Sequence, residues 1–142
     1  MFDVWHLALP VENLERSVRF YVDGLGFELL GFSESDRYRF AFARVPGGAF
    51  TIEFLEFRDA AAERKRPDHL AFEVPDLGGY RERLLKTGFF DELAEIADAG
   101  PGLKRFVVHD PDGVPVQFYL GRAGYDRSIA ASVNSRKEAQ HV

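Results

Sequence analysis

The sequence HLALPV at residues 6–11 is followed, 63 positions further on, by the similar sequence HLAFEV at residues 69–74. The similarity continues through an Asx residue and a leucine, at positions 13 and 14 in the first copy and 76 and 77 in the second. A repeat at a fixed interval indicates architecture more firmly than local propensity does, because each copy must form the same unit. The chain is therefore predicted to contain two copies of one supersecondary unit.

Each copy has the pattern of a short strand followed by a helix. The apolar stretch that opens it suits a strand, and apolar residues then recur at helical spacing. Asn13 is the expected N-cap of the first helix, and Gly24 and Gly26 mark its end. Asp76 is the expected N-cap of the second helix, and Gly88 is its stop. Both helices are predicted to pack on a sheet.

Three further segments with strand character follow each helix. They cover residues 27–32, 38–44 and 50–57 in the first half and residues 92–96, 103–108 and 114–120 in the second. The sequence DPDG at residues 110–113 predicts a tight turn before the last strand. The expected fold is α+β, with two βαβββ units at residues 4–57 and 67–120 whose mixed sheets curve into a cup.

Length and composition fit a single globular domain at residues 1–121 followed by a C-terminal tail at residues 122–142. A chain of 142 residues with 46% hydrophobic residues is long enough to bury a core. The tail is polar, and open sheets leave unpaired edges. We therefore expect the tail to pack on a neighbour and the protein to form a homodimer.

Charge and residue usage exclude several classes of function. The net charge is −5 without a basic block, which disfavours nucleic acid as a partner. The chain has no cysteine, so any metal must be held by histidine, carboxylate or amide groups. The N-terminus lacks the pattern of a signal peptide and no apolar run is long enough to span a membrane, so a cytoplasmic location without membrane attachment is expected.

Four side chains are placed on the same face of the predicted sheets by the alternation of residues along a strand. His6 and His69 occupy equivalent positions in the two opening strands and point away from the helices. Glu53 and Gln117 occupy the closing strands of the same two units. Two imidazoles, a carboxylate and an amide oxygen suit a borderline or hard divalent ion, with water completing an octahedron.

An alternative interpretation of these residues is structural. A single histidine in a strand is more often a hydrogen-bonded core residue than a metal ligand. The repeat favours the metal site, because His6 and His69 are equivalent in the two copies. Glu53 also lies among apolar neighbours, where an unpaired charge would be costly.

The chain resembles the glyoxalase/bleomycin-resistance/dioxygenase superfamily, whose fold is called the vicinal oxygen chelate fold, over residues 4–121. The resemblance rests on five motifs in a fixed order: HLALPV at 6–11, SVRFY at 17–21, GLGF at 24–27, DHLAFEV at 68–74 and DPDG at 110–113. It implies that one residue from the first and last strand of each unit binds the metal, which corresponds to His6, Glu53, His69 and Gln117. The metal could be Zn, Ni, Co, Mn or Fe, and no organic cofactor is expected.

The resemblance implies a metal-dependent lyase, isomerase or epimerase of the glyoxalase I type. Such an enzyme stabilises the enediolate or enolate of a small carbonyl or thioester substrate by Lewis-acid catalysis. Glu53 is then the expected catalytic base, because the amide of Gln117 cannot carry a proton. Many members have Glu at the position of Gln117, including the extradiol dioxygenases and the fosfomycin-modifying thiol transferases, so those activities fit less well.

Two further residues are candidates for the substrate pocket. Arg39, on a face with Ala41 and Ala43, could neutralise an anionic group of the substrate, although a solvated edge arginine is the plainer interpretation. Tyr119, two residues beyond Gln117, could line the pocket or simply pack.

The alternative function is a metal-free binding protein that resembles the bleomycin-resistance members, in which the cup only sequesters a ligand. The four candidate ligands favour the metal-dependent enzyme.

Overall fold

The computed structural model describes residues 1, 3–59 and 64–140, with side chains described except at positions 133–135, 137, 138 and 140. The first unit contains β1 (His6–Pro10), α1 (Leu14–Val18), a π-helical segment (Arg19–Gly24), β2 (Glu28–Glu34), β3 (Tyr38–Arg44) and β4 (Thr51–Phe57). The second contains β5 (Leu70–Glu73), α2 (Leu77–Lys86), β6 (Ala97–Gly100), β7 (Leu103–His109) and β8 (Pro115–Leu120). A last helix, α3 (Arg122–Gln140), follows β8.

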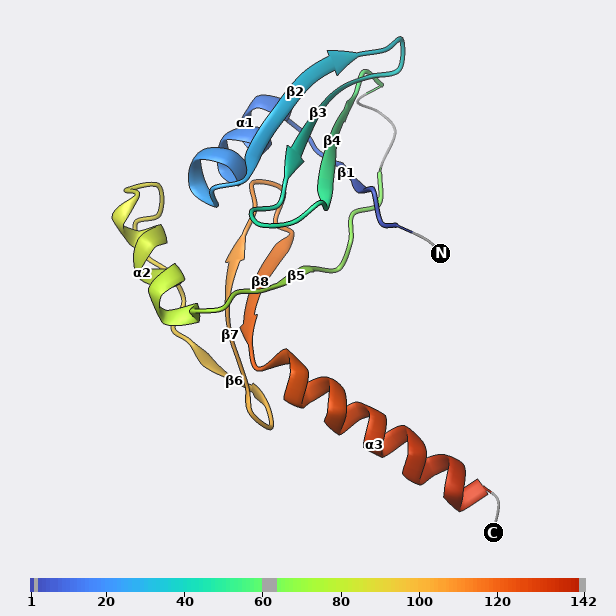
Figure 1. Cartoon of the computed structure of the whole chain (residues 1–142). Coiled ribbons are helices and arrows are strands. Elements are labelled where there is room, and N and C mark those ends of the chain that lie inside the picture. The colour runs from blue at the N-terminus through green and yellow to red at the C-terminus, as the bar shows by residue number, and fades with distance from the viewer. Residues whose placement is uncertain (2, 60–63, 141–142) are drawn as a thin grey trace.

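The predicted α+β fold of two βαβββ units is confirmed. Each unit forms a four-stranded mixed sheet, with strand orders β1-β4-β3-β2 and β5-β8-β7-β6. The first and last strands of each unit are parallel, and the remaining pairs are antiparallel. Figure 1 shows the first sheet above the second, with α1 and α2 on the same side of the molecule.

The expected N-caps of the two helices are present. The Asn13 side chain accepts a hydrogen bond from the Arg16 amide at 2.9 Å. The Asp76 side chain accepts one from the Gly79 amide at 3.0 Å. Both bonds satisfy amide groups that have no partner within the first turn.

One predicted strand is wrong. Residues 92–96 form no strand, and the first strand after α2 is β6, which begins at Ala97. The Arg81 side chain donates to the carbonyls of Leu93 and Ala94 at 2.8 and 2.9 Å and to Glu95 at 3.2 Å. These bonds tie the segment to α2 and occupy carbonyls that a ladder would use.

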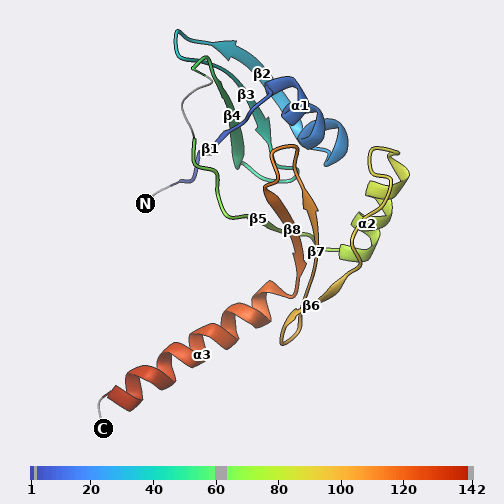
Figure 2. The ribbon, with the colours of Figure 1, turned by 180° about the vertical axis from the view of Figure 1, so that it is seen from behind.

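The tail is helical as far as Gln140. Its alanines, arginines, lysine and glutamate are good helix formers, which favours this state over an irregular tail. Figures 1 and 2 show α3 leaving the end of β8 and extending away from both sheets. In the part of the chain that the structure describes, no helix is both long enough and apolar enough to cross a membrane.

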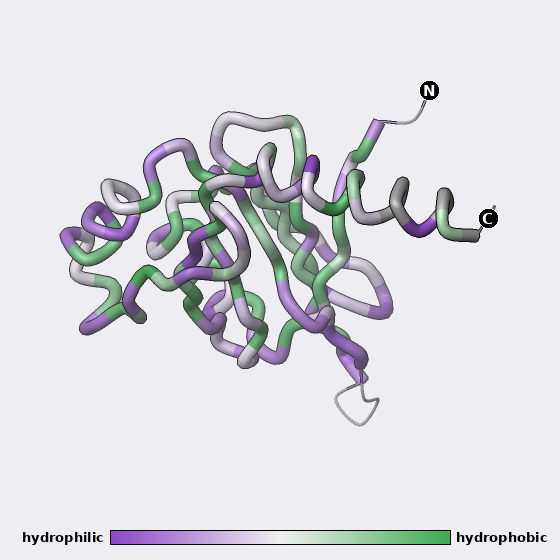
Figure 3. The backbone as a smooth tube through the Cα atoms, turned by 90° about the horizontal axis from the view of Figure 1, so that it is seen from below, coloured by the Kyte–Doolittle hydropathy of each residue, from purple (hydrophilic) through white to green (hydrophobic). Residues whose placement is uncertain are grey.

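The helices of both units share one apolar core with the helix-covered faces of the sheets. The core is continuous between the units, since the Phe27 and Phe72 rings lie 5.6 Å apart and the Tyr80 hydroxyl donates to the Leu25 carbonyl at 3.1 Å. Gly24 lets the Phe89 ring pack closely at this junction, because a Cβ at position 24 would lie 2.9 Å from that ring and would displace it. In Figure 3 the central strands are largely coloured as hydrophobic.

The DPDG turn between β7 and β8 packs on the first unit. Asp110 is buried, and its carboxylate accepts hydrogen bonds from the amides of Asp112 and Val114 at 2.9 Å and from the Tyr21 hydroxyl at 2.8 Å. Burial and the neighbouring Asp110 charge raise the pKa of Tyr21, so this phenol stays protonated and donates. The turn therefore joins the last hairpin of the second unit to the π-helical segment of the first.

We expect Tyr21→Phe to lower the free energy of unfolding by about 2 kcal/mol, because it removes a buried hydrogen bond to a carboxylate. Urea unfolding monitored by circular dichroism measures the change. Tyr38→Phe is the matched control, since the Tyr38 hydroxyl makes no hydrogen bond to any described residue, and it should change stability by less than about 0.5 kcal/mol. Equal effects of the two substitutions would contradict the role given to the Tyr21–Asp110 bond.

Candidate functional site

His6 in β1 lacks hydrogen bonds from both ring nitrogens among the described residues. Its Nδ1 is buried without a partner, and its Nε2 lies 3.9 Å from Glu53 Oε1, which is too long for a hydrogen bond. The ring is held by edge-on contacts with Trp5 and Phe42, whose centroids are 4.2 and 5.3 Å away. His6 is therefore fixed in position by packing, and its nitrogens remain available, unlike those of a hydrogen-bonded core histidine.

Glu53 in β4 faces the same side of the first sheet as His6. It pairs in register with Ala8 of β1 and Phe42 of β3, on the face away from α1. Its side chain is 15% exposed, and no described residue donates a hydrogen bond to its carboxylate. Two ligands of one zinc-like ion, each at about 2.0–2.2 Å, lie roughly 3–3.5 Å apart. The His6–Glu53 spacing is close to that value.

His69 lies directly before β5 and forms a different kind of arrangement. Its Nδ1 is 2.7 Å from Asp68 Oδ2, and its side chain is 44% exposed. A carboxylate on Nδ1 holds the proton there and leaves the Nε2 lone pair free, which is the arrangement found around many metal-binding histidines.

Gln117 in β8 is the other candidate ligand of the second sheet. Its Oε1 accepts a hydrogen bond of 2.6 Å from the Tyr119 hydroxyl, which itself accepts one of 3.0 Å from Arg105 Nη1. All three residues lie on the face of the sheet away from α2, because Arg105 pairs in register with Tyr119, two residues from Gln117. Tyr119 lines a hollow of about 550 Å³ on this face, and its role in a substrate pocket stays a prediction.

The four candidate ligands do not converge within one chain. His6 and Glu53 belong to the open face of the first sheet, and His69 and Gln117 belong to that of the second. No group of three or more His, Cys, Asp or Glu side chains that could hold a metal ion gathers among the described residues. The structure thus presents two half-sites, each next to an edge strand, β1 in one sheet and β5 in the other.

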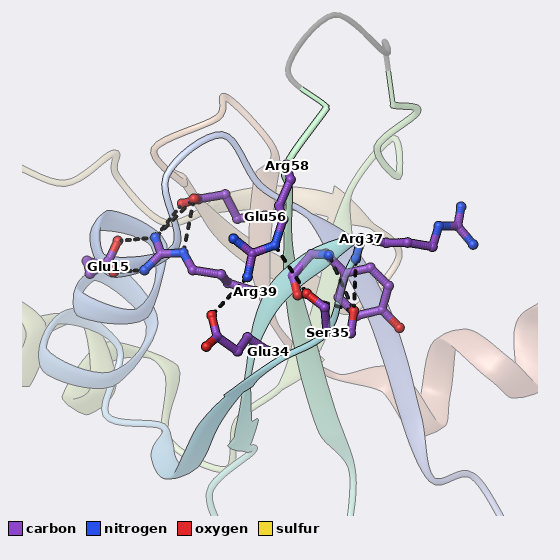
Figure 4. A network of polar contacts seen from close by, with 8 residues as sticks. Glu15, Glu34, Ser35, Arg37, Arg39, Glu56 and Arg58 are labelled. Carbon is purple, nitrogen blue, oxygen red and sulfur yellow. Dashed lines mark hydrogen bonds and ion pairs between the residues drawn. The ribbon is translucent and has the colours of Figure 1, made fainter.

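The expected pocket role of Arg39 is corrected by its position. Arg39 pairs in register with Glu56 and lies on the helix-covered face of the first sheet, opposite to that of Glu53. Its guanidinium donates to Glu15 of α1 at 2.7 Å and to Glu56 at 3.0 Å, as Figure 4 shows. These hydrogen bonds raise the pKa of Arg39. Glu56 also accepts from the Leu14 amide at 2.7 Å, so this network fixes the start of α1.

Two features of the open faces were not predicted from the sequence. One is Arg105, which the register of β7 against β8 places beside Tyr119. The other is an apolar hollow of about 330 Å³ on the first sheet, lined by Trp5, Leu30, Gly31, Phe32, Ser33, Phe40, Phe42 and Thr51. Strand alternation could have predicted both features. In residues 38–44 it places Phe40 and Phe42 on the same sheet face as Glu53, and in residues 103–108 it places Arg105 on the same face as Gln117.

Comparison with known proteins identifies the family. Residues 4–118 match the Glyoxalase/Bleomycin resistance protein/Dioxygenase superfamily. The chain belongs to this superfamily. It is 32% identical over 136 residues to the lactoylglutathione lyase of Neisseria meningitidis, a match that covers 88% of this chain and 94% of that protein. It is also 28% identical over 122 residues to YwkD of Bacillus subtilis, an uncharacterised protein.

Solved structures of the superfamily share the fold. A glyoxalase/bleomycin resistance protein/dioxygenase domain from Frankia superimposes with a TM-score of 0.66 at 28% identity, covering 85% of this chain and 98% of that one. The trypanothione-dependent glyoxalase I of Leishmania major gives 0.65 at 19% identity, with 96% and 99% coverage. TnmS3, an antibiotic-binding protein from Streptomyces, gives 0.63 at 21% identity, with 83% and 94% coverage. One fold thus includes proteins named as enzymes and a protein named as a binder.

The position of Arg39 predicts a purely structural phenotype. Arg39→Met should lower the urea midpoint of unfolding more than the matched Arg44→Met does, because Arg39 bridges two carboxylates and, among the described residues, Arg44 forms an ion pair with Glu28 alone. The imidazole NMR signals of His6 should not move in Arg39→Met. A shift of those signals, with no loss of stability, would place Arg39 in the functional site after all.

Proposed function

We propose that the protein is a metal-dependent lyase, isomerase or epimerase of the glyoxalase I type. The observation that carries this proposal is His6, an immobilised imidazole with both nitrogens unpaired among the described residues, beside a carboxylate that also lacks a donor. A buried nitrogen without a partner, such as His6 Nδ1, is costly for a protein unless a ligand satisfies it. The 32% identity to a lactoylglutathione lyase supports the same class of reaction.

The residues present fit a divalent metal ion. His6 and Glu53 offer a nitrogen and a carboxylate oxygen, and His69 and Gln117 offer a second nitrogen and an amide oxygen. Histidine and oxygen ligands suit Zn, Ni, Co, Mn or Fe, and do not distinguish among them. The Asp68 carboxylate on His69 Nδ1 orients that ligand from behind, whereas the Tyr119 hydroxyl uses one lone pair of Gln117 Oε1 and leaves the other for a metal.

A second copy of the chain would complete the site. Each copy presents a His–Glu half-site beside the β1 edge and a His–Gln half-site beside the β5 edge. In a two-fold dimer the contact is self-complementary, so the first unit of one copy can face the second unit of its partner, twice. Exposed apolar residues next to the first half-site favour such burial: Val4, Trp5, Leu30 and Phe32 are 71%, 70%, 44% and 54% exposed.

The closing strands β4 and β8 contribute different groups to the proposed reaction, a carboxylate from Glu53 and an amide from Gln117. A bound metal ion supplies Lewis-acid stabilisation of the oxygen that becomes negatively charged when a neighbouring carbon loses its proton. Glu53 accepts that proton, because it is the only carboxylate among the four candidate ligands and lies in a partly buried position without competing donors. Gln117 cannot exchange a proton, and its Oε1 is shared with the Tyr119 hydroxyl, which donates to it. Together these residues place acid–base chemistry on the first unit.

The second candidate function is a binding protein that sequesters its ligand without a metal. The apolar hollow of about 330 Å³ on the first sheet, lined by Trp5, Phe32 and Phe42 among others, favours this candidate because it suits a flat aromatic molecule. Metal analysis of protein purified without chelator separates the two candidates. A stoichiometric divalent metal supports the enzyme, and its absence supports the binder.

Glu53→Gln tests the catalytic assignment. Metal content should fall modestly, since an amide oxygen can still coordinate, while turnover should fall by about 10²–10⁴-fold with the loss of the base. The assay is proton exchange into 2-oxo thiol adducts and acyl-CoA thioesters, followed by NMR in deuterium oxide. Glu56→Gln, on the opposite face of the same strand, is the matched control and should exchange normally. Full activity in Glu53→Gln would show that the base is elsewhere.

A mixing experiment tests whether the two half-sites meet across a dimer. His6→Ala and His69→Ala should each abolish high-affinity metal binding alone, because each damages every site of a homodimer. Co-expression of the two variants with different tags should restore one intact site per mixed dimer, since the undamaged halves face each other there. Metal content of the doubly tagged species, measured by mass spectrometry, gives the answer. No recovery in that species would place the whole site within one chain.

A further inference from the structure

The open face of the second sheet carries a polar hollow of about 550 Å³ that the proposed metal ligands do not fill. It is formed by β5, β7 and β8 and by the first turn of α3, which supplies Arg122 and Tyr125. Tyr125 packs against Gly100 of β6, since its ring lies within van der Waals distance, 3.4 Å, of a Cβ built on that glycine. Figure 2 shows α3 beginning beside this sheet, and Arg122 and Tyr125 make the start of the tail part of the lining of the hollow.

Arg105 is the unusual residue of this hollow. It is half-buried, and its hydrogen-bond partner is the neutral hydroxyl of Tyr119, at 3.0 Å from Nη1. No described carboxylate lies within ion-pair distance of Arg105, whereas Arg39 and Arg81 both bind carboxylates. A guanidinium has five N–H donors, so most of those of Arg105 remain open toward the hollow.

The one carboxylate in the wall is engaged elsewhere. Glu73 of β5 accepts a hydrogen bond of 2.9 Å from the Arg122 amide at the start of α3. Glu73 and Arg105 both pair in register with Tyr119, from opposite sides, so they are separated by two strand spacings, about 10 Å. The Arg122 guanidinium is turned to Asp126 at 3.3 Å. Arg105 is thus the positive group without a countercharge.

We propose that Arg105 binds an anionic group, a carboxylate or a phosphate, of the molecule that occupies this hollow. The planar fork of arginine matches both anions in a bidentate manner. Tyr119 supports the fork from one side and links it to Gln117 through its 2.6 Å bond. The anion therefore binds about two residues along the sheet, or about 7 Å, from the candidate metal ligand.

This proposal makes the substrate class of the proposed enzyme more specific. It rests on the proposed function, because it takes the molecule in the hollow to be the substrate of that enzyme. The substrate class is a small 2-oxo or acyl compound that carries its own carboxylate or phosphate close to the reacting carbon. A neutral 2-oxo compound would leave Arg105 half-buried without a counterion, and so would bind less well. Recognition of the anion belongs to the second unit of one copy, while Glu53 in the first unit of the other copy of the proposed dimer acts on the carbon.

The test measures binding to the metal-free protein, so its outcome is independent of catalysis and of metal binding. Chelator-treated ¹⁵N-labelled full-length protein is titrated with pyruvate, inorganic phosphate and the neutral analogue hydroxyacetone. The Nε–Hε signal of Arg105, assigned by its loss in Arg105→Lys, should shift and saturate with pyruvate or phosphate and should not respond to hydroxyacetone. The tighter of the two anions indicates whether the natural group is a carboxylate or a phosphate.

Variants show whether Arg105 is responsible. Arg105→Met should weaken binding of the preferred anion by about tenfold or more, and Arg105→Lys by less, because lysine retains the charge and loses the fork. Arg83→Met is the matched control: it removes the same charge from α2, where Arg83 lies over the Tyr80 ring, and should leave the affinity unchanged. If Arg105→Met fails to fold, Arg105→Lys still decides.

Three results would overturn the proposal. The first is that neither anion shifts the Arg105 signal, and the second is that hydroxyacetone shifts it as strongly as pyruvate does. The third is that Arg105→Lys and Arg83→Met weaken binding equally, which would indicate a general effect of charge. Loss of turnover in Glu53→Gln with intact anion binding would support both proposals separately.

Discussion

The structure depends on the docking of one turn. Asp110 uses one carboxylate oxygen to close the β7–β8 turn and the other to accept the Tyr21 hydroxyl of the first unit. Asp112 adds a second attachment, since its almost fully buried carboxylate lies within 3.6 Å of Arg16 and Arg66. The Tyr21–Asp110 and Arg16–Asp112 contacts join segments about ninety residues apart in the sequence, so they fix the relative position of two units whose sheets share no hydrogen-bonded strand. Buried bonds to a carboxylate are among the stronger polar interactions in a protein.

This docking decides where the functional faces lie. The turn, both helices and the aromatic contacts between Phe27 and Phe72 bury the helix-covered faces of the two sheets together. Their other faces, which carry Glu53 and Gln117, are left uncovered within one chain and are separated from each other. The same packing that stabilises the monomer therefore prevents it from assembling a four-ligand site on its own. A function that needs all four ligands needs a second copy, and a function that needs only a hollow does not.

Much of this could be predicted from the sequence because it is local. The repeat and the period of two along each strand place His6 with Glu53, and His69 with Gln117, on the open faces. The prediction for Arg39 was wrong, although strand alternation could have corrected it. Alternation puts Arg39 on the same face as Ala41 and Ala43, and both alanines are fully buried under α1. The strand expected at 92–96 did not form, because Arg81 on α2 binds the backbone carbonyls of Leu93 and Ala94. The separation of the half-sites could not be predicted, because it depends on contacts between residues far apart in the chain.

The two units share one fold and differ in the polar residue of the closing strand, which is Glu53 in β4 and Gln117 in β8. At the first position a carboxylate, Glu53, accepts no hydrogen bond from a described residue, which suits the proposed role as base. At the equivalent position of the second unit an amide, Gln117, is tied to Tyr119 and through it to Arg105. An amide adds no negative charge beside Arg105, whereas a glutamate there would partly neutralise the guanidinium and compete with an incoming anion. The exchange of Glu for Gln is thus consistent with a site that needs its positive charge on one side and its base on the other.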